Sequence, residues 1–247
     1  MEPINKFHRP GGDQYCSVYA DILSQAVTGE FIGMQNFASM VELFDDVEEK
    51  LEAVEHANNE MGHGLAFRKA AKDLGVDIIV DIDAPYWKRI RSAFLKWARL
   101  GDLSACMLIQ EIMLESFAVS MYYEVGSKAD NNLADVFNRI AAEEEGHLQH
   151  AVDFFQVEIK RDPISFEKKV HHIHNDVMTV LAEMVGKQDA SGHCGLCKGE
   201  CVKDSLHHVD LNIADMRGKA LNHYLKSLDR LGLRGEKTLE WVAKLPV

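Results

Sequence analysis

Apolar side chains recur every three or four positions along most of the chain, which is the spacing of amphipathic helices that bury one face. The sequence shows no strand-like alternation of any length. Glycine, proline and capping residues divide the periodic stretches. We expect helices at about residues 14–40, 45–74, 85–101, 103–125, 131–159, 164–185 and 209–231, and a short one before Pro246.

Helix start and stop signals set these boundaries. Asp45 and Glu48 have the spacing of a capping box at the start of the second helix, and Gly75 suits its C-terminal end. Pro85 fits the first turn of the third helix. The long segments at 14–40, 45–74, 103–125 and 131–159 predict an all-α four-helix bundle over about residues 14–160, with additional C-terminal helices at about 164–245.

Composition narrows the class of protein. The chain of 247 residues is 47% hydrophobic, and no Pro/Gly/Ser-rich linker divides it, so we expect a single domain over residues 1–247. A net charge of −12 argues against nucleic acid as a partner. No apolar run reaches the roughly 18 residues of a membrane span, and the N-terminus lacks the apolar core of a signal peptide. We therefore expect a cytoplasmic protein without a membrane span.

Two glutamates interrupt apolar stripes. Glu30 lies within the stripe Leu23, Ala26, Val27, Met34 and Phe37, and Glu115 lies within the stripe Leu108, Ile112, Val119 and Tyr122. An ionised carboxylate is almost never fully buried without a partner. These segments offer little Lys or Arg, so a metal ion is the natural compensating charge.

The second and fifth helices complete the pattern with a Glu-x-x-His each, Glu60 to His63 and Glu144 to His147. Residues at i and i+3 share a helix face, so carboxylate and imidazole converge. Each pair follows its lone glutamate by a similar interval, 30 residues in one case and 29 in the other. The repeat predicts six ligands for two metal ions, as in ferritin-like carboxylate proteins. Carboxylate and imidazole donors suit iron or manganese. The predicted ligands are Glu30, Glu60, His63, Glu115, Glu144 and His147.

At these residues the sequence resembles the cyanobacterial aldehyde-deformylating oxygenases, formerly called aldehyde decarbonylases. The similar segments are Gly29-Glu30, Asn59-Glu60-Met61-Gly62-His63 with Phe67, Cys106 to Gln110, Leu114 to Ala118, and Glu143 to Leu148. The resemblance implies a di-iron centre held by the same six residues. It also implies dioxygen, a ferredoxin-type electron donor, and conversion of fatty aldehydes to alkanes or alkenes with release of formate.

Departures from the family pattern leave the substrate open. Gly62 and Phe37 replace an Arg and a Tyr, Phe31-Ile32-Gly33 replaces acidic residues, and Glu111 replaces a small or apolar residue. The alternatives are another di-iron hydroxylase or N-oxygenase, and a non-catalytic ferritin-like protein that binds iron or scavenges peroxide. Shell formation and the lack of an apolar tunnel would distinguish the last class.

Other side chains are candidates around the metals. Gln110, Tyr122 and Glu143 are candidates for hydrogen bonds to ligands. Glu111 is a further ligand or proton relay, or, as we favour, a carboxylate paired with Lys or Arg at the bundle edge. Leu23, Val27, Phe31 and Met34 are expected to border an apolar cavity beside Glu30, and Phe37, Phe67 and Phe117 are further candidates for its lining.

A Cys-rich loop at about residues 187–203 is the other concentrated signal. His193, Cys194, Cys197 and Cys201 have spacing suited to a zinc site, and a thiol switch and no role are the alternatives. The histidines at positions 171, 172 and 174 lie near a helix start, and we expect them at the surface.

Overall fold

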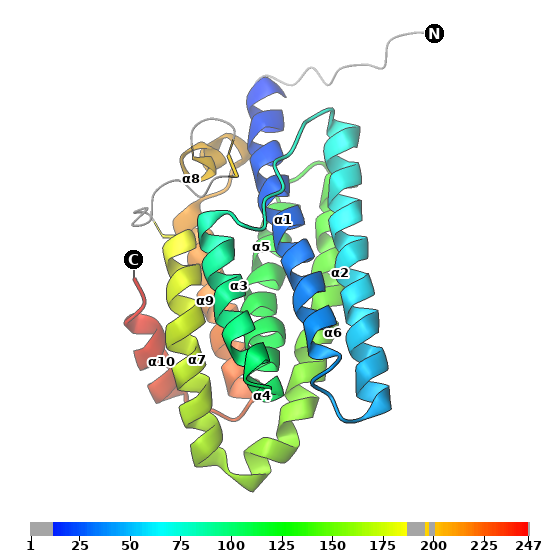
Figure 1. Cartoon of the computed structure of the whole chain (residues 1–247). Helices are drawn as coiled ribbons and strands as arrows, with labels where there is room; N and C mark the ends of the chain where they lie inside the picture. Colours follow the sequence, from blue (N-terminus) through cyan, green and yellow to red (C-terminus); the bar gives the residue numbers. More distant parts are fainter. Residues whose placement is uncertain (1–11, 187–195, 198–200, 247) are drawn as a thin grey trace.

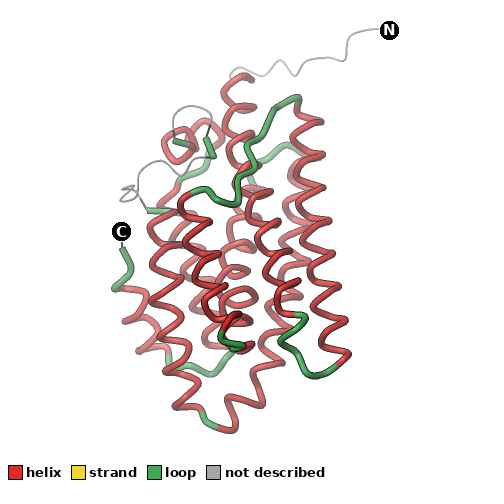
Figure 2. The backbone as a smooth tube through the Cα atoms, in the orientation of Figure 1, coloured by secondary structure: helices red, strands yellow, loops and turns green. Residues whose placement is uncertain are grey.

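The computed structural model describes residues 12–186, 196–197 and 201–246. Helices joined by short loops make up these ranges, and no strand occurs within them (Figure 2). The elements are α1 (Gly12–Met40), α2 (Val47–Leu74), α3 (Pro85–Arg99), α4 (Leu103–Met107), the π-helix η1 (Leu108–Leu114), α5 (Glu115–Gly126), α6 (Asn131–Arg161), α7 (Pro163–Met184), α8 (Val202–Ser205), the 3-10 helix η2 (Leu206–Val209), α9 (Ile213–Arg230) and α10 (Gly235–Ala243).

Two helical hairpins form the centre of the molecule. One pairs α1 with α2, and the other pairs α5 with α6 (Figure 1). The segments α4, η1 and α5 follow one another without a loop, as the single helix expected at 103–125. Helices α3 and α7 pack together, and α9 packs on α5. The prediction of an all-α bundle with additional C-terminal helices is confirmed, whereas the expectation of one domain over residues 1–247 stays a prediction.

The helix boundaries follow local capping chemistry. Helix α2 begins at Val47 because the carboxylate of Asp46 accepts hydrogen bonds from the backbone N–H groups of Glu48 (2.9 Å) and Glu49 (3.3 Å). The expected cap at Asp45 was therefore wrong by one residue. Gly75 ends the helix as expected, with a left-handed φ of 71° that only glycine adopts readily.

The C-terminal part differs more from expectation. The short elements α8 and η2 occupy residues expected to be loop and helix start. The helix expected from Val209 begins only at Ile213. Asp210 has a left-handed φ of 56°, which interrupts the helix, and the side chain of Asn212 caps the next one through the N–H of Ala214 (2.9 Å).

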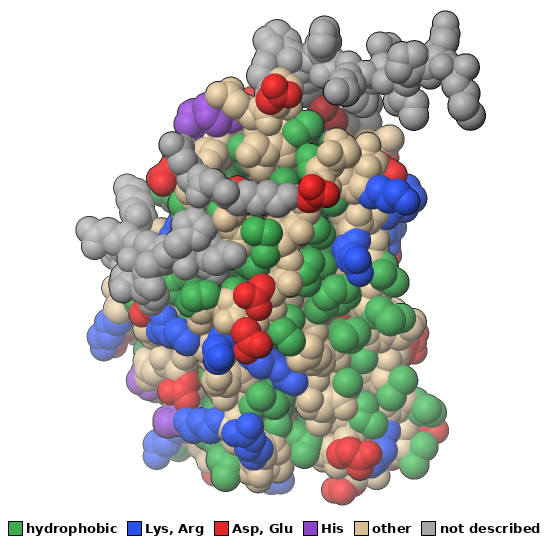
Figure 3. All heavy atoms as spheres, turned by 45° about the horizontal axis from the view of Figure 1, so that its top comes forward, with side chains coloured by type: hydrophobic (Ala, Val, Ile, Leu, Met, Phe, Trp, Pro, Cys, Tyr) green, Lys and Arg blue, Asp and Glu red, His purple; other side chains and the backbone are tan. Residues whose placement is uncertain are grey.

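Most apolar side chains of the described residues lie in the core, and some are exposed. By length and composition the stretch Leu103–Gly126 could cross a membrane, although Glu111 and Glu115 break its apolar run. Within its most apolar window 72% is buried in the bundle, as expected for the core helix of a soluble protein. On the side where α2 lies, several apolar side chains reach the surface (Figure 3), among them Leu51 and Leu65.

Candidate metal centre

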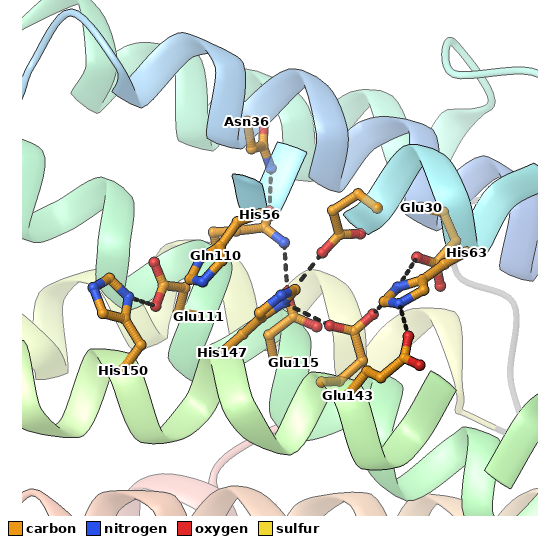
Figure 4. A network of polar contacts seen from close by, with 12 residues as sticks. Glu30, Asn36, His56, His63, Gln110, Glu111, Glu115, Glu143, His147 and His150 are labelled. Carbon is orange, nitrogen blue, oxygen red and sulfur yellow. Dashed lines mark hydrogen bonds and ion pairs between the residues drawn. The ribbon is translucent and has the colours of Figure 1, made fainter. Parts of the chain in front are cut away.

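Four helices bring the six predicted ligands to one level of the bundle (Figure 4). Helix α1 carries one of them, α2 carries a Glu and a His, the start of α5 carries one, and α6 carries a Glu and a His. All six are buried, with exposures of 1–3%. The set comprises Glu30, Glu60, His63, Glu115, Glu144 and His147.

The six side chains form two groups that could each hold a metal ion. In one group, atoms of Glu30, Glu60, His63 and Glu144 all lie within 4.8 Å of one another. In the other, the same holds for Glu60, Glu115, Glu144 and His147. Glu60 and Glu144 belong to both groups. Their carboxylates are therefore placed to bridge two cations, as in the carboxylate proteins that bind a metal pair.

Both imidazoles direct their Nδ1 atoms at this cluster of carboxylates. The Nδ1 of His63 lies 2.8 Å from Glu144 Oε1 and 3.3 Å from Glu30 Oε2. The Nδ1 of His147 lies 2.6 Å from Glu144 Oε2 and 3.5 Å from Glu60 Oε1. The same Nδ1 lies 3.9 Å from Glu115 Oε1. Each carboxylate thus has an imidazole neighbour, but two imidazoles face four carboxylates.

Several of these buried atoms lack a hydrogen bond of acceptable geometry. They are Glu30 Oε2, Glu60 Oε1, Glu144 Oε2 and His147 Nδ1. Buried polar atoms left without partners are costly and uncommon in proteins. All four belong to the two groups above, and carboxylate and imidazole donors satisfy iron or manganese. The donor set therefore fits a pair of such ions.

The acidities show how unfavourable the cluster is without cations. Burial, followed by the charge of Glu144, raises the pKa of Glu60 well above its usual range and that of Glu115 to about 8. Burial alone would also raise the pKa of Glu144, but contacts with the two imidazoles outweigh it and lower that pKa to about 2. Burial alone would lower the pKa of His63, yet contacts with Glu144 and Glu30 raise it to about 10. Without metal, protons supply the positive charge that cations would otherwise provide.

Hydrogen bonds from surrounding side chains hold the ligands in place. The hydroxyl of Tyr122 donates to Glu30 Oε1, and Gln110 Nε2 donates to Glu115 Oε1 (2.8 Å). Gln110 itself accepts a hydrogen bond from Asn36 Nδ2 (2.6 Å), a residue that the sequence analysis missed. This arrangement fixes the carboxylates on the metal side of the bundle.

The outward nitrogen of His63 is also held. Its Nε2 lies 2.7 Å from Glu143 Oε2, and Arg139 donates to the same carboxylate at 2.9 Å. Contacts with Arg139 and His63 lower the pKa of Glu143 although burial opposes them. A carboxylate on the far nitrogen of a metal-binding imidazole orients the ring and raises its basicity.

The π-helix changes which residues face Glu115. Its hydrogen bonds join residues five apart, as in the bond from the N–H of Glu115 to the carbonyl of Gln110. Gln110 therefore lies over Glu115. Glu111 instead lies 2.7 Å from the Nδ1 of His150 on α6, where it is 1% exposed. The expected pairing of Glu111 with Lys or Arg was wrong, because the partner is an imidazole.

Gly33 leaves room for a ligand. A Cβ atom at this position would lie 2.8 Å from Cδ of Glu60 and 3.2 Å from Gln110 Nε2. The side chain of Glu60 therefore passes close to the backbone of α1 at Gly33, where no Cβ atom blocks it. The sequence could have indicated this close approach, because Gly33 lies one turn after Glu30 in the segment that departs from the family pattern.

An apolar cavity of about 210 Å³ adjoins the carboxylates. Glu30, Glu60, Glu115 and Glu144 form part of its wall. The remaining wall is mostly apolar and comes from α1, α3, α5, α6, α7 and the C-terminal elements, including Ile22, Ala26, Trp87, Phe117, Met121, Leu181 and Met216.

The predicted lining of this cavity was largely wrong. Leu23, Val27, Phe31 and Met34 do not line it, and neither do Phe37 and Phe67. Leu23 and Val27 belong to the same buried cluster as Phe67 of α2, and Phe31 packs on Gly64 of α2. Of the expected residues only Phe117 reaches the cavity.

The Cys-rich loop is described only in part. His193 and Cys194 lie outside the described residues. Cys197 is buried, and its Sγ accepts a hydrogen bond from the N–H of Val202 at 3.4 Å, while Cys201 lines the apolar cavity. Within the described part of the chain no cysteine belongs to a cluster of metal-ligating side chains. His174, expected at the surface, is 1% exposed and lies 3.1 Å from the hydroxyl of Tyr224.

Comparisons with known proteins agree with this geometry. A family model described as long-chain fatty aldehyde decarbonylase matches residues 12–212. Among solved structures, the chain is similar to a protein from Synechococcus described as having aldehyde deformylating oxidase activity. The TM-score is 0.79 at 15% sequence identity, over 94% of this chain and 97% of that chain. At this identity the structural likeness speaks for a shared fold.

Proposed function

The chain belongs to the long-chain fatty aldehyde decarbonylase family, and from this premise we propose an oxygen-dependent di-iron enzyme that acts on a fatty aldehyde. The products would be an alkane or alkene one carbon shorter and formate. The observation that carries the proposal is the position of the carboxylate cluster in the wall of an apolar cavity. The two ligand groups would hold the metals, and the cavity would hold the alkyl chain.

The residues that would hold the metals are the six of the two groups. Glu60 and Glu144 would bridge the ions, while Glu30 with His63 and Glu115 with His147 would each complete one side. When bound, the pair supplies dioxygen activation, with electrons from a ferredoxin-type donor as the family resemblance implies. We propose two iron ions as the bound metals, and two manganese ions would fit the same donors.

The protein's own groups position the ligands and the substrate. Tyr122 holds Glu30, Gln110 holds Glu115, and Glu143 holds His63, so that the carboxylates and imidazoles keep their inward directions. The apolar wall excludes water and favours an alkyl chain by roughly 0.8 kcal/mol for each CH₂ group it buries. The polar end of a bound aldehyde would face the carboxylates, since the metals that they would hold are where the reaction takes place.

A non-catalytic role in iron storage fits the cavity poorly. Iron storage needs acidic groups near the metals but no apolar chamber beside them. A hydroxylase or N-oxygenase would use the same chamber for a different molecule. Product identity therefore separates these alternatives.

The test is aldehyde turnover by iron-loaded, reduced protein supplied with oxygen and an electron donor. We expect about two irons per chain, formate release, and better turnover of long aldehydes than of short ones. The double variant Glu60→Ala, Glu144→Ala should lose the metals and the activity. Full iron loading without formate at any chain length would refute the aldehyde reaction and favour the hydroxylase alternative.

We propose zinc binding by the Cys-rich loop as a separate property. His193, Cys194, Cys197 and Cys201 would supply the ligands. Replacing the three cysteines with serine should remove zinc and spare the absorbance of the di-iron centre. Wild-type protein that contains no zinc after purification without chelators would contradict this assignment.

A further inference from the structure

A second cluster of metal-ligating side chains lies outside the six residues described above. It consists of Glu52 and His56 on α2 and His150 on α6, and one donor atom from each lies within 4.8 Å of the others. We propose that these three residues, with Glu49 beside them, bind a single divalent transition-metal ion. None of the four belongs to the candidate metal pair.

The donor spacing is close to that of a coordinated ion. His150 Nε2 lies 3.4 Å from Glu49 Oε2 and 3.7 Å from Glu52 Oε2, and His56 Nε2 lies 4.0 Å from Glu52 Oε1. Donors about 2.0–2.2 Å from one metal lie roughly 3–3.5 Å from each other. The carboxylates need to move only slightly to reach this spacing. They are free to do so, because the side chain of Glu49 is 36% exposed and that of Glu52 is 45% exposed.

The imidazole of His150 is already oriented from behind. Its Nδ1 lies 2.7 Å from the buried carboxylate of Glu111, which is 1% exposed. With Nδ1 donating to that carboxylate, Nε2 is the nitrogen that would coordinate a cation, in exchange for the proton it shares with Glu49. A carboxylate on the far nitrogen is the usual support of a metal-binding histidine, and in this protein Glu143 holds His63 in the same way.

The ring of His56 is held by packing. It contacts the edge of Phe37 at a centroid distance of 5.0 Å and lies 4.2 Å from the ring of His147. His56 is 8% exposed, and its buried Nδ1 has no hydrogen-bond partner. The packed ring presents Nε2, the nitrogen nearest Glu52, to the cluster, so little of the ring's freedom is lost when that nitrogen binds an ion.

The charge of the cluster and its access to solvent also favour a bound cation. Among the described residues, the ion pairs of Glu49, Glu52 and Glu111 involve only His56 and His150. Three carboxylates beside two imidazoles attract a divalent cation, and the mixed nitrogen and oxygen donors suit Mn²⁺, Fe²⁺ or Zn²⁺ better than Ca²⁺. A surface cleft lined by Glu49 and His150 connects the cluster to solvent. The ion would reach it without passing through the apolar cavity.

The experiment is a Mn²⁺ titration of iron-loaded protein followed by electron paramagnetic resonance. Free Mn²⁺ is counted from its six-line signal, and pulsed measurements detect nitrogen coupled to the bound ion. We expect one Mn²⁺ per chain beyond the iron pair, with coupling to two imidazole nitrogens. Glu52→Gln should weaken binding at least tenfold. Glu55→Gln, an exposed glutamate one turn away that is outside the cluster, should bind like wild type.

The outcomes separate this site from the iron pair. Iron absorbance should be the same in both variants, because neither residue is a ligand of the pair. Bound Mn²⁺ without nitrogen coupling would overturn the proposal, since surface carboxylates alone would then account for it. Equal affinity of the Glu52→Gln and Glu55→Gln variants, or no Mn²⁺ beyond the pair, would overturn it too.

Discussion

Replacing Gly33 with Ala should disturb metal binding without unfolding the protein. The new Cβ would lie 2.8 Å from Cδ of Glu60 and 3.2 Å from Gln110 Nε2. Ordinary contact begins at 3.4 Å, so the Glu60 carboxylate must move by about 0.6 Å or more. Glu60 belongs to both ligand groups, and a shift of this size exceeds the roughly 0.5 Å tolerance of a working metal site.

The substitution should weaken metal binding while leaving the stability of the metal-free protein nearly unchanged. The end of the Glu60 side chain can rotate away at little cost, and Ala in a helix interior is favoured over Gly by roughly 0.5–1 kcal/mol. Metal-free Gly33→Ala protein should therefore be about as stable as wild type. Loss of a well-placed ligand or its support costs about 10–100-fold in metal affinity, so iron binding should weaken by that factor.

Gly62→Ala is the matched control. Gly62 also lies inside a helix, but a Cβ there would meet nothing within 4 Å. We expect a gain of roughly 0.5–1 kcal/mol in unfolding free energy and unchanged iron affinity. Chemical denaturation of metal-free protein and competition titration with a chelator measure the two quantities. Gly33→Ala protein that binds both irons as tightly as Gly62→Ala would refute the assignment of Glu60 as a shared ligand.

Three further substitutions test other parts of the structure. Tyr122→Phe removes the hydroxyl that donates to Glu30 and should weaken metal binding by about 10–100-fold, measured by the same chelator competition. Ala118→Leu fills the apolar cavity and should lower the affinity for long aldehydes by roughly fourfold per displaced CH₂, whereas Ala66→Leu, away from the cavity, should not; equal substrate titrations would contradict the cavity assignment. Burial lowers the pKa of His174 to about 4, so the folded state resists protonation, and stability present above pH 6.5 is lost as the pH falls toward 4. His174→Gln should remove about 3 kcal/mol of this acid sensitivity in denaturation measured across that range.

The bundle could be read from the sequence because two strong local signals agreed. Periodic apolar positions defined the long helices, and Gly75 and Pro163 marked where two of them end or begin. The buried stripes around Glu30 and Glu115 identified carboxylates that the core could not tolerate alone. Such signals depend on residues close in sequence, so they can be recognised without knowledge of the tertiary structure.

The surroundings of the centre depended on contacts between helices and were harder to predict. His56 lies one turn before Glu60 on the same face of α2, so its burial could have been inferred from the spacing. The role of Asn36 could not have been inferred in this way, because it depends on a hydrogen bond to Gln110 on another helix. The cavity lining was assigned to the wrong residues of α1, since Leu23 and Val27 are packed inside the core cluster with Phe67, whereas Ile22 and Ala26 reach the cavity.

The position of Glu111 shows where helical periodicity stops being a guide. A period of 3.6 residues places Glu111 and Glu115, four apart, on one face. The π-helix at Leu108–Leu114 replaces that spacing with one of five, which brings Gln110 over Glu115 and leaves Glu111 beside His150. One extra residue per turn therefore gives the ligand a neutral amide donor instead of a second carboxylate. Because a carboxylate over Glu115 would repel it and an amide donates to it, the π-helix reduces the electrostatic cost of burying the ligand.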